Sequence, residues 1–261
     1  MSWNPSQYLQ YEDARLRPAL DLIARIPLDA PRSIVDLGCG AGNVAQWLAK
    51  RWPQASITGV DGDAAMLARA RKVTDENKAL TFVQADLAHW APARPVDLIF
   101  SNAALHWLND HAQLFPRLME QVAPEGVLAV QMPDNFARPS HTALYRAARE
   151  PRWRARLERY IRGEPVAPLS AYYDWLAPHA KALDLWETDY LQHLPARTDG
   201  EHPVVAWIRG SSLTHFLAAL PADEGAAFVD DYQTRIARAY PMRPDGSVLF
   251  PFRRVFIIAR K

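Results

Sequence analysis

The segment Asp36-Leu37-Gly38-Cys39-Gly40-Ala41-Gly42-Asn43 joins an apolar run to a helical pattern, and it decides the fold. Three glycines at alternate positions let the backbone turn sharply and approach a ligand without a Cβ in the way. In open α/β sheets, ligands bind beyond the carboxyl ends of the strands, close to such a turn. Because a tight strand-to-helix turn also favours glycine for structural reasons alone, the loop by itself leaves both interpretations open.

Short apolar runs rich in Val, Ile and Leu alternate with helical patterns through the first half of the chain. The runs cover residues 33–38, 55–61, 79–86, 96–102 and 126–132, and helices are expected at 17–26, 43–51, 64–72 and 110–122. Such runs are typical of strands buried on both faces of a parallel sheet. Prolines end several segments, as in the expected turn Pro124-Glu125-Gly126. The alternation predicts an α/β fold with a Rossmann-like, doubly wound, mostly parallel sheet.

The pattern changes after about residue 134, where helical segments rich in proline begin. The chain carries no Gly/Ser linker and no internal repeat that would separate an independent second domain. We therefore expect one domain over 1–261 with a helical cap inserted in its C-terminal half. Its expected parts are an N-terminal helical lid (1–30), a ligand-binding core (31–134), cap insertions (135–182 and 200–240) and closing strands (183–194 and 247–260).

Composition and charge limit the kinds of partner that the protein is expected to bind. The 261 residues include 30 Lys+Arg and 29 Asp+Glu, a formal charge of +1 that gives no general electrostatic case for nucleic acid. The single cysteine, Cys39, allows no internal disulfide and no cysteine-based zinc cage, and fits a reducing compartment. The first residues are polar and acidic where a secretory signal would need an apolar core, and no run approaches the roughly 18 apolar residues that cross a bilayer. We expect a cytoplasmic protein with no metal, membrane, nucleic-acid or obligate protein partner.

Polar side chains follow the strands at the edge where the glycine loop lies. Asp61 ends the second predicted strand nineteen residues after Gly42, an offset at which a carboxylate meets ribose hydroxyls. Asp86 ends the third predicted strand and Asn102 the fourth. A single Asp here commonly caps a strand end or a helix start. Together with Asp36, however, three acids at successive strand ends favour a ligand site.

The acidic crevice suits a cationic nucleoside better than a dinucleotide. A pyrophosphate is typically held by the spacing G-x-G-x-x-G at a helix N-terminus without nearby anions. Here the spacing is G-x-G-x-G, and Asp36 lies two residues before it. S-adenosylmethionine carries a ribose diol, an amino group and a sulfonium but no phosphate, so it matches these charges. A dinucleotide-dependent dehydrogenase is the less favoured alternative.

The stretches DLGCGAGN, GVDGD, FVQADLAHW and DLIFSNAALHW together resemble the class I S-adenosylmethionine-dependent methyltransferases. The likeness is closer still to the family that methylates trans-aconitate, and it runs nearly end to end. It includes WNPSQYLQYEDARLRPALDLIARIPL near the start, GVLAVQMPDN in the middle and FRRVFIIAR near the end. The glycine motif is generic to the superfamily, whereas these three segments are much more specific to the family.

The resemblance implies a role for each candidate cofactor residue. The glycines would pass under the methionine part of S-adenosylmethionine: Gly38, Gly40 and Gly42. Asp61 would hold the ribose, Asp86 the adenine amino group, and Asn102 would face the sulfonium region. From the N-terminal segment, Tyr8 and Arg17 could close over the carboxylate of the cofactor as a lid, with simple packing as the alternative.

Methyl transfer to a carboxylate needs positioning more than acid–base chemistry. A carboxylate with a pKa of about 4 is already ionised at pH 7 and needs no base, so in-line placement would provide the catalysis. Arginines would hold the other carboxylates bidentately. Arg253 and Arg254 are the candidates; adjacent strand residues point to opposite faces, and the resemblance favours Arg254. Relatives typically carry Gly-Leu-Arg-Pro where this chain has Ser212-Leu213-Thr214-His215, so one arginine of the family is missing here.

Four further residues are candidates near the transferred methyl group or the acceptor. His106 and Trp107 follow the fourth strand and could wall the transfer site, and His106 could act as a base for a hydroxyl acceptor. Tyr172 and Trp207 could form an aromatic lid over the substrate, with core packing as the alternative. We expect an O-methyltransferase that esterifies a small polycarboxylic acid such as trans-aconitate and releases S-adenosylhomocysteine. A hydroxylated acceptor and a non-catalytic cofactor-binding protein remain the alternatives.

Overall fold

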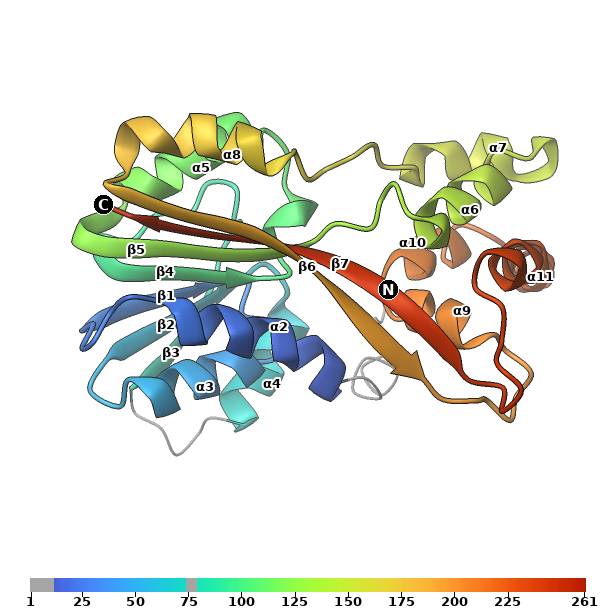
Figure 1. Ribbon diagram of the computed structural model, residues 1–261, viewed down its shortest axis with the longest axis horizontal. Helices are drawn as coiled ribbons and strands as arrows, with labels where there is room; N and C mark the ends of the chain where they lie inside the picture. The colour runs from blue at the N-terminus through green and yellow to red at the C-terminus, as the bar shows by residue number, and fades with distance from the viewer. Residues whose placement is uncertain (1–11, 74–78) are drawn as a thin grey trace. The chain divides into compact units, whose positions relative to one another are not determined.

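The computed structural model describes residues 12–73 and 79–261 (Figure 1). The chain divides into two compact units. Among the described residues, the sheet unit lies within Arg15–Pro133, Pro165–Thr188 and Arg254–Lys261, and the helical unit comprises 12–14, Asp134–Glu164 and Asp189–Arg253. The segment 135–182, expected to be one insertion, is thus shared between the units.

Seven strands of the described residues form one sheet in the order β3-β2-β1-β4-β5-β7-β6. Their bounds are β1 (Ser33–Leu37), β2 (Ser56–Asp61), β3 (Leu80–Gln84), β4 (Val96–Asn102), β5 (Val122–Pro133), β6 (Ala182–Leu194) and β7 (Val248–Arg260). The strands from β3 to β5 pair in parallel, and β7 is antiparallel to β5. This confirms the predicted doubly wound, mostly parallel sheet. The order reverses at β1, between β2 and β4, where such sheets bind ligands.

Helices cover the parallel strands on both sides (Figure 1). The helices α2 (Glu12–Arg25), α3 (Asn43–Arg51) and α4 (Ala64–Val73) lie on one side, and α5 (His111–Glu120) and α8 (Leu169–Leu176) lie on the other. The central strands β1, β4 and β5 are buried on both faces, as their apolar runs predict. The helix expected at 17–26 begins earlier, at Glu12. None of the described helices is long and apolar enough to span a membrane.

The segment Pro124-Glu125-Gly126 is not the turn that its composition predicts. It lies inside β5, which begins at Val122, and α5 ends earlier than expected, at Glu120. The pairing of β5 with β4 shifts register here, and Glu125 has a φ of 64°. A Cβ on Gly126 would lie 2.8 Å from the carbonyl oxygen of Asp97. Glycine is therefore needed because the two strands approach closely at a bulge.

The helical unit has its own buried core. Its helices are α6 (Pro139–Ala148), α7 (Pro151–Leu157), α9 (Pro203–Arg209), α10 (Ser212–Leu217) and α11 (Ala222–Ala239). Three of them, α6, α7 and α9, begin with proline, whose fixed φ suits the first helical position. Aromatic rings fill the space between them; Trp153 and Phe228 meet edge to face with centroids 5.0 Å apart.

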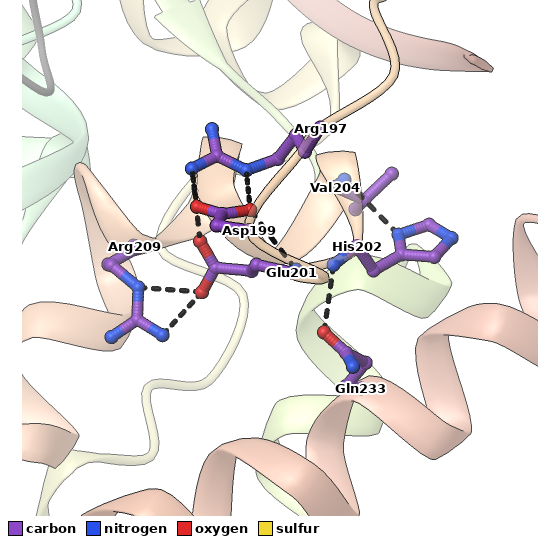
Figure 2. A network of polar contacts seen from close by, with 7 residues as sticks. All are labelled: Arg197, Asp199, Glu201, His202, Val204, Arg209 and Gln233. Carbon is purple, nitrogen blue, oxygen red and sulfur yellow. Dashed lines mark hydrogen bonds and ion pairs between the residues drawn. The ribbon is translucent and has the colours of Figure 1, made fainter. Parts of the chain in front are cut away.

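Ion pairs hold the loop that leads into α9 (Figure 2). Arg197 donates through Nε to Asp199 at 3.0 Å and lies 3.9 Å from Glu201. Arg209, in the last turn of α9, donates through Nε to Glu201 at 2.8 Å. Glu201 thus connects the loop to the end of the helix that follows it.

His202 caps the N-terminus of α9 in the same network (Figure 2). Its Nδ1 accepts from the backbone N–H of Val204 at 3.2 Å, and its backbone N–H donates to Gln233 at 2.8 Å. Because Nδ1 accepts, the proton of the neutral ring is on Nε2, which donates to the carbonyl of Tyr240 at 2.9 Å. Burial lowers the pKa of His202, which keeps the ring in this neutral form.

Candidate functional site

The glycine loop lies between β1 and α3 and requires glycine at each of its three positions. Gly38, Gly40 and Gly42 have φ values of 84°, 54° and 80°, in the left-handed region. A Cβ on Gly38 would lie only 2.1 Å from the Cβ of Ala104. The N–H of Gly38 donates to the carbonyl of Val60 at 2.7 Å. The loop is therefore held against the end of β2 and packed against the turn after β4.

Asp61, at the end of β2, fixes this loop from the side. Its Oδ2 accepts from the N–H of Gly40 at 2.8 Å, and its Oδ1 accepts from the N–H of Asp63 at 2.9 Å. Each carboxylate oxygen can accept more than one hydrogen bond, so capacity for a ligand hydroxyl remains. The residue is half-buried and thus reaches both the loop and the surface.

Asp36 is a buried acid on β1, with 1% of its surface exposed. Its Oδ2 atom has no hydrogen-bond partner among the described residues. Burial, with a smaller contribution from the charge of Asp61, raises the pKa of Asp36 to about 7. A buried carboxylate of this kind gains most from a cationic or hydrogen-bond-donating ligand group.

Asp86 does not end the third strand as predicted, because β3 stops at Gln84. Asp86 is exposed and fixes the turn that follows: its Oδ1 accepts from the N–H of Ala88 at 3.0 Å, and its Oδ2 lies 2.6 Å from Nδ1 of His89. The hydrogen bond to His89 is the main reason that the pKa of Asp86 is lowered. Local capping is therefore one role of this side chain, and its contact with adenine stays a prediction.

The turn after β4 carries the next group of candidates. The Oδ1 atom of Asn102 is buried and has no hydrogen-bond partner in the part of the chain that the structure describes. Ala103 follows with a φ of 53°, and its N–H donates to the carbonyl of Gln131 at 2.9 Å. The short helix η1 (Leu105–Trp107) comes next; His106 is buried, Trp107 is 42% exposed, and their ring centroids lie 4.8 Å apart.

The two candidate arginines have different environments. Arg254 is 4% exposed, and its Nη1 donates to Oε1 of Gln131 at 3.2 Å. Arg253 forms an ion pair with Asp134, and its backbone N–H donates to Oδ1 of Asn135 at 2.9 Å. The difference is expected for neighbours on a strand, whose side chains point to opposite faces. Arg254 belongs to the sheet unit and Arg253 to the helical unit.

Five polar side chains share one face of the sheet at the carboxyl ends of its parallel strands. Alternate residues on a strand point to the same face, and so do residues in register on adjacent strands. The pairings that align them are Asp36↔Gly59, Asp36↔Phe100, Asn102↔Gln131 and Gln131↔Phe256. The five residues are Asp61, Asp36, Asn102, Gln131 and Arg254. Acids thus stand at β1 and β2, amides at β4 and β5, and the cation at β7.

Sequence reasoning missed one member of this row, Gln131. A signal for it existed, because this glutamine interrupts the apolar run GVLAVQM close to the carboxyl end of a buried strand. Only the hydrogen bond to Arg254, 123 residues further along the chain, shows what the amide contacts.

The aromatic and lid candidates are not members of this row on the sheet. Tyr172 is buried in the sheet unit, where its hydroxyl accepts from the N–H of Ala167 at 3.2 Å and lies 2.6 Å from Nδ1 of His111. Trp207 is buried in the core of the helical unit. Arg17 is on the exposed side of α2, and Tyr8 lies outside the described residues. Substrate or cofactor contacts for all four stay predictions.

The departure from the family pattern lies in α10. Thr214 donates through Oγ1 to the carbonyl of Arg209 at 2.7 Å, and His215 is exposed. Ser212 Oγ lies 3.3 Å from Nε2 of the buried His141. The hydroxyl groups of Thr214 and Ser212 thus bond within the helical unit. Thr214 is neutral at the position where the resemblance implies a charged arginine.

Comparisons with known proteins agree with the fold. A model of a methyltransferase domain matches residues 34–126. The solved YcgJ protein of Bacillus subtilis superposes with a TM-score of 0.59 at 18% identity, over 94% of this chain and 98% of that one. Phosphoethanolamine N-methyltransferase 2 of Haemonchus contortus, in complex with S-adenosyl-L-methionine, gives a TM-score of 0.55 at 17% identity. The alignment covers 94% of this chain and 52% of that one. At these identities the solved structures establish the fold alone.

The sequence relatives are much closer. Trans-aconitate 2-methyltransferase of Azoarcus sp. strain BH72 is 48% identical over 261 residues, which cover 99% of this chain and 98% of the relative. The similarity therefore includes the helical unit and the final strand, as well as the segment that the domain model matches. The chain belongs to the trans-aconitate 2-methyltransferase family.

Proposed function

We propose that this protein transfers a methyl group from S-adenosylmethionine to a carboxylate of trans-aconitate, which yields a monomethyl ester and S-adenosylhomocysteine. The observation that carries the proposal is the row of polar side chains on one face of the sheet, in a chain similar to this family along its whole length. Acids at one end of the row suit a cationic cofactor, and Arg254 at the other suits an anionic acceptor.

The residues around the glycine loop fit S-adenosylmethionine. The cofactor supplies an electrophilic methyl group on a sulfonium. Asp36 has a buried oxygen without a partner among the described residues, which suits the amino group of the methionine part. Asp61 would accept from the ribose hydroxyls, Asp86 from the adenine amino group, and Asn102 would face the sulfonium. The glycines allow the backbone to approach the methionine part, because each of them lacks a Cβ.

The acceptor carboxylate needs orientation and no base, since it is ionised at neutral pH. Arg254 would hold a carboxylate that does not react, because a guanidinium on the attacking group would reduce its nucleophilicity. His106 and Trp107 would wall the path of the methyl group, and exclusion of water there protects the transfer.

The proposal extends to the setting of the reaction. We assign both units to a single methyltransferase domain, acting in the cytoplasm on a small acid without a metal, nucleic-acid, membrane or obligate protein partner. The lone buried Cys39 supports a reducing compartment. Burial, with the charges of Asp36 and Asp61, raises the pKa of its thiol far above the usual range, so Cys39 serves as packing and not as a nucleophile.

A radiolabelled methyl-transfer assay tests this function directly. The purified protein is incubated with S-adenosylmethionine and trans-aconitate, cis-aconitate, isocitrate or a panel of hydroxylated metabolites. We expect transfer to trans-aconitate, with a base-labile ester as product and, at saturating S-adenosylmethionine, no rate-controlling group that titrates near pH 7. Transfer only to hydroxyl acceptors, or cofactor binding without transfer to any acid, would overturn the proposal.

A further inference from the structure

Gln131 connects the turn after β4 to the buried arginine on β7. Its backbone carbonyl accepts from the N–H of Ala103 at 2.9 Å, and its side-chain Oε1 accepts from Nη1 of Arg254 at 3.2 Å. A guanidinium only donates hydrogen bonds, so the atom that faces Arg254 must be the amide oxygen. The orientation of the amide is therefore fixed, and its Nε2 group points away from the arginine.

The Nε2 group of Gln131 is buried and has no hydrogen-bond partner within residues 12–73 and 79–261. Gln131 is 0% exposed, so bulk water does not satisfy this donor. Buried polar groups are nearly always hydrogen-bonded, because leaving one unsatisfied is costly. An unsatisfied donor beside a buried cation marks a place that a ligand completes.

The neighbour of Gln131 across the sheet points to the same place. Asn102 is in register with Gln131 on β4, so the two side chains share a face. The buried Oδ1 of Asn102 also lacks a partner among the described residues, so these two amides are not bonded to each other through those atoms. Asn102 belongs to the expected methyl-transfer region. Gln131 therefore stands between that region and Arg254.

We infer that Gln131 determines specificity for the acidic acceptor: its Oε1 holds the Arg254 guanidinium in place, and its Nε2–H donates to the carboxylate that Arg254 binds. This inference rests on the proposed function and names the group that completes its acceptor site. A neutral donor is well suited to the task because it strengthens the hold on the carboxylate without adding a charge. The two groups together recognise a planar carboxylate and exclude acceptors with a hydroxyl or an apolar group at that position.

The fold separates this side-chain role from the backbone role of Gln131. The backbone bond to Ala103 holds the turn whose next residue, Ala104, packs against Gly38 of the cofactor loop. Substitution of the side chain leaves that backbone bond in place. Binding of the cofactor product should therefore survive changes that weaken binding of the acid, and this separation makes a sharp test.

The test compares Gln131→Met with Gln121→Met. Gln121 has the same side chain and also a buried Oε1 without a partner among the described residues, but it immediately precedes β5, at the other end of the strand. We expect Gln131→Met to raise the KM for trans-aconitate by roughly ten- to a hundredfold, the loss of a hydrogen bond to a charged group. The Kd for S-adenosylhomocysteine, measured by calorimetry, should change less than about twofold, since hydrogen bonds to the cofactor are retained. Gln121→Met should leave both constants unchanged.

A second variant, Gln131→Glu, keeps the shape but places a carboxylate against Arg254. The new ion pair removes the donor and neutralises the arginine, so the KM should rise further than in Gln131→Met. If Gln131→Met does not fold, Gln131→Asn keeps the amide but draws it back by one methylene, and it should also raise KM selectively. An unchanged KM in the folded variants, or an equal loss of S-adenosylhomocysteine affinity, would overturn the inference. Failure of the wild-type protein to methylate any acid would instead refute the proposed function.

Discussion

Gly38 and Ala104 are in contact at the point where the cofactor loop meets the turn after β4. The contact is so close that a Cβ on Gly38 would lie 2.1 Å from the Cβ of Ala104, and the backbone of Gly38 has a φ of 84°. Ala104 in turn follows Ala103, which is itself left-handed and bonded to the carbonyl of Gln131. The shape of the loop and the shape of the turn therefore depend on each other.

Gly38→Ala should destabilise the protein by roughly 2–4 kcal/mol, because the added methyl group meets both backbone strain and a steric clash. Denaturant unfolding measures the change in the free energy of unfolding. Gly163→Ala is the matched control, since a Cβ there meets nothing within 4 Å; it should change stability by less than about 0.5 kcal/mol. Equal effects of the two substitutions would contradict the role assigned to this contact.

The pKa of Asp36, raised to about 7, predicts a proton exchange on cofactor binding. Near pH 6.5 a large fraction of the carboxyl is protonated in the free protein, and a cationic ligand group favours the ionised form. Binding of S-adenosylmethionine should therefore release a proton. Calorimetry in buffers of different ionisation enthalpy measures the release, and Asp36→Asn should abolish it. Binding without proton release at this pH would show that no cation approaches Asp36.

The same group gives the stability of the free protein a defined pH dependence. The folded pKa lies above the unfolded value of 3.8, so the folded state holds its proton more strongly. The contribution of the protonated Asp36 carboxyl to the free energy of unfolding is complete below about pH 4, and it is lost as pH rises towards 7. Because Asn cannot ionise, the free energy of unfolding of Asp36→Asn should increase relative to that of the wild type as pH rises from 4 to 7. A constant difference between the two proteins from pH 4 to 7 would contradict the burial of Asp36.

Much of the sheet could be predicted because its signals are local. Apolar runs flanked by glycine or proline predict β1, β2 and β4 to within about one residue, since burial on both faces requires such composition. The turn predicted at Pro124-Glu125-Gly126 is wrong because the structure of this segment depends on a non-local contact. Proline and glycine together indicate a turn, and only the partner strand, with the Asp97 carbonyl close to Gly126, turns the segment into a bulge.

The candidate site could be predicted only in part. Asp36, Asp61 and Asn102 lie at or near the carboxyl ends of parallel strands that are neighbours in the sheet, so their convergence follows from parallel topology. Gln131 and Arg254 meet through the antiparallel pairing of β5 with β7, which joins residues far apart in sequence. No local pattern encodes that pairing. Trp207 and Tyr172 could not be assigned from the sequence either, because the spacing of aromatic residues does not distinguish one that covers a ligand from one in a core.

Protonation of the buried His141 should lower the free energy of unfolding at acidic pH. It is buried in the helical unit between the hydroxyls of Ser140 and Ser212, at 3.1 and 3.3 Å, and burial lowers its pKa to about 4. Because the folded pKa lies below the usual 6.5, its contribution is complete above pH 6.5 and is lost as pH falls to 4. His141→Gln should reduce the steepness of this loss in unfolding experiments. The exposed His215→Gln is the control, and an equal effect there would exclude His141 as the cause.

The adjacent arginines Arg253 and Arg254 allow the sharpest division between substrate binding and structure. Arg254→Lys keeps the charge but loses the planar pair of donors, so the KM for trans-aconitate should rise roughly ten- to a hundredfold with unchanged cofactor affinity. Arg253→Lys should leave the KM unchanged, because Arg253 is paired with Asp134 and its backbone with Asn135. Initial-rate kinetics and calorimetry on the two variants check both statements. If Arg253→Lys raised the KM and Arg254→Lys did not, the acceptor would lie on the opposite face of β7, away from Gln131, and the assigned orientation of the acid would be wrong.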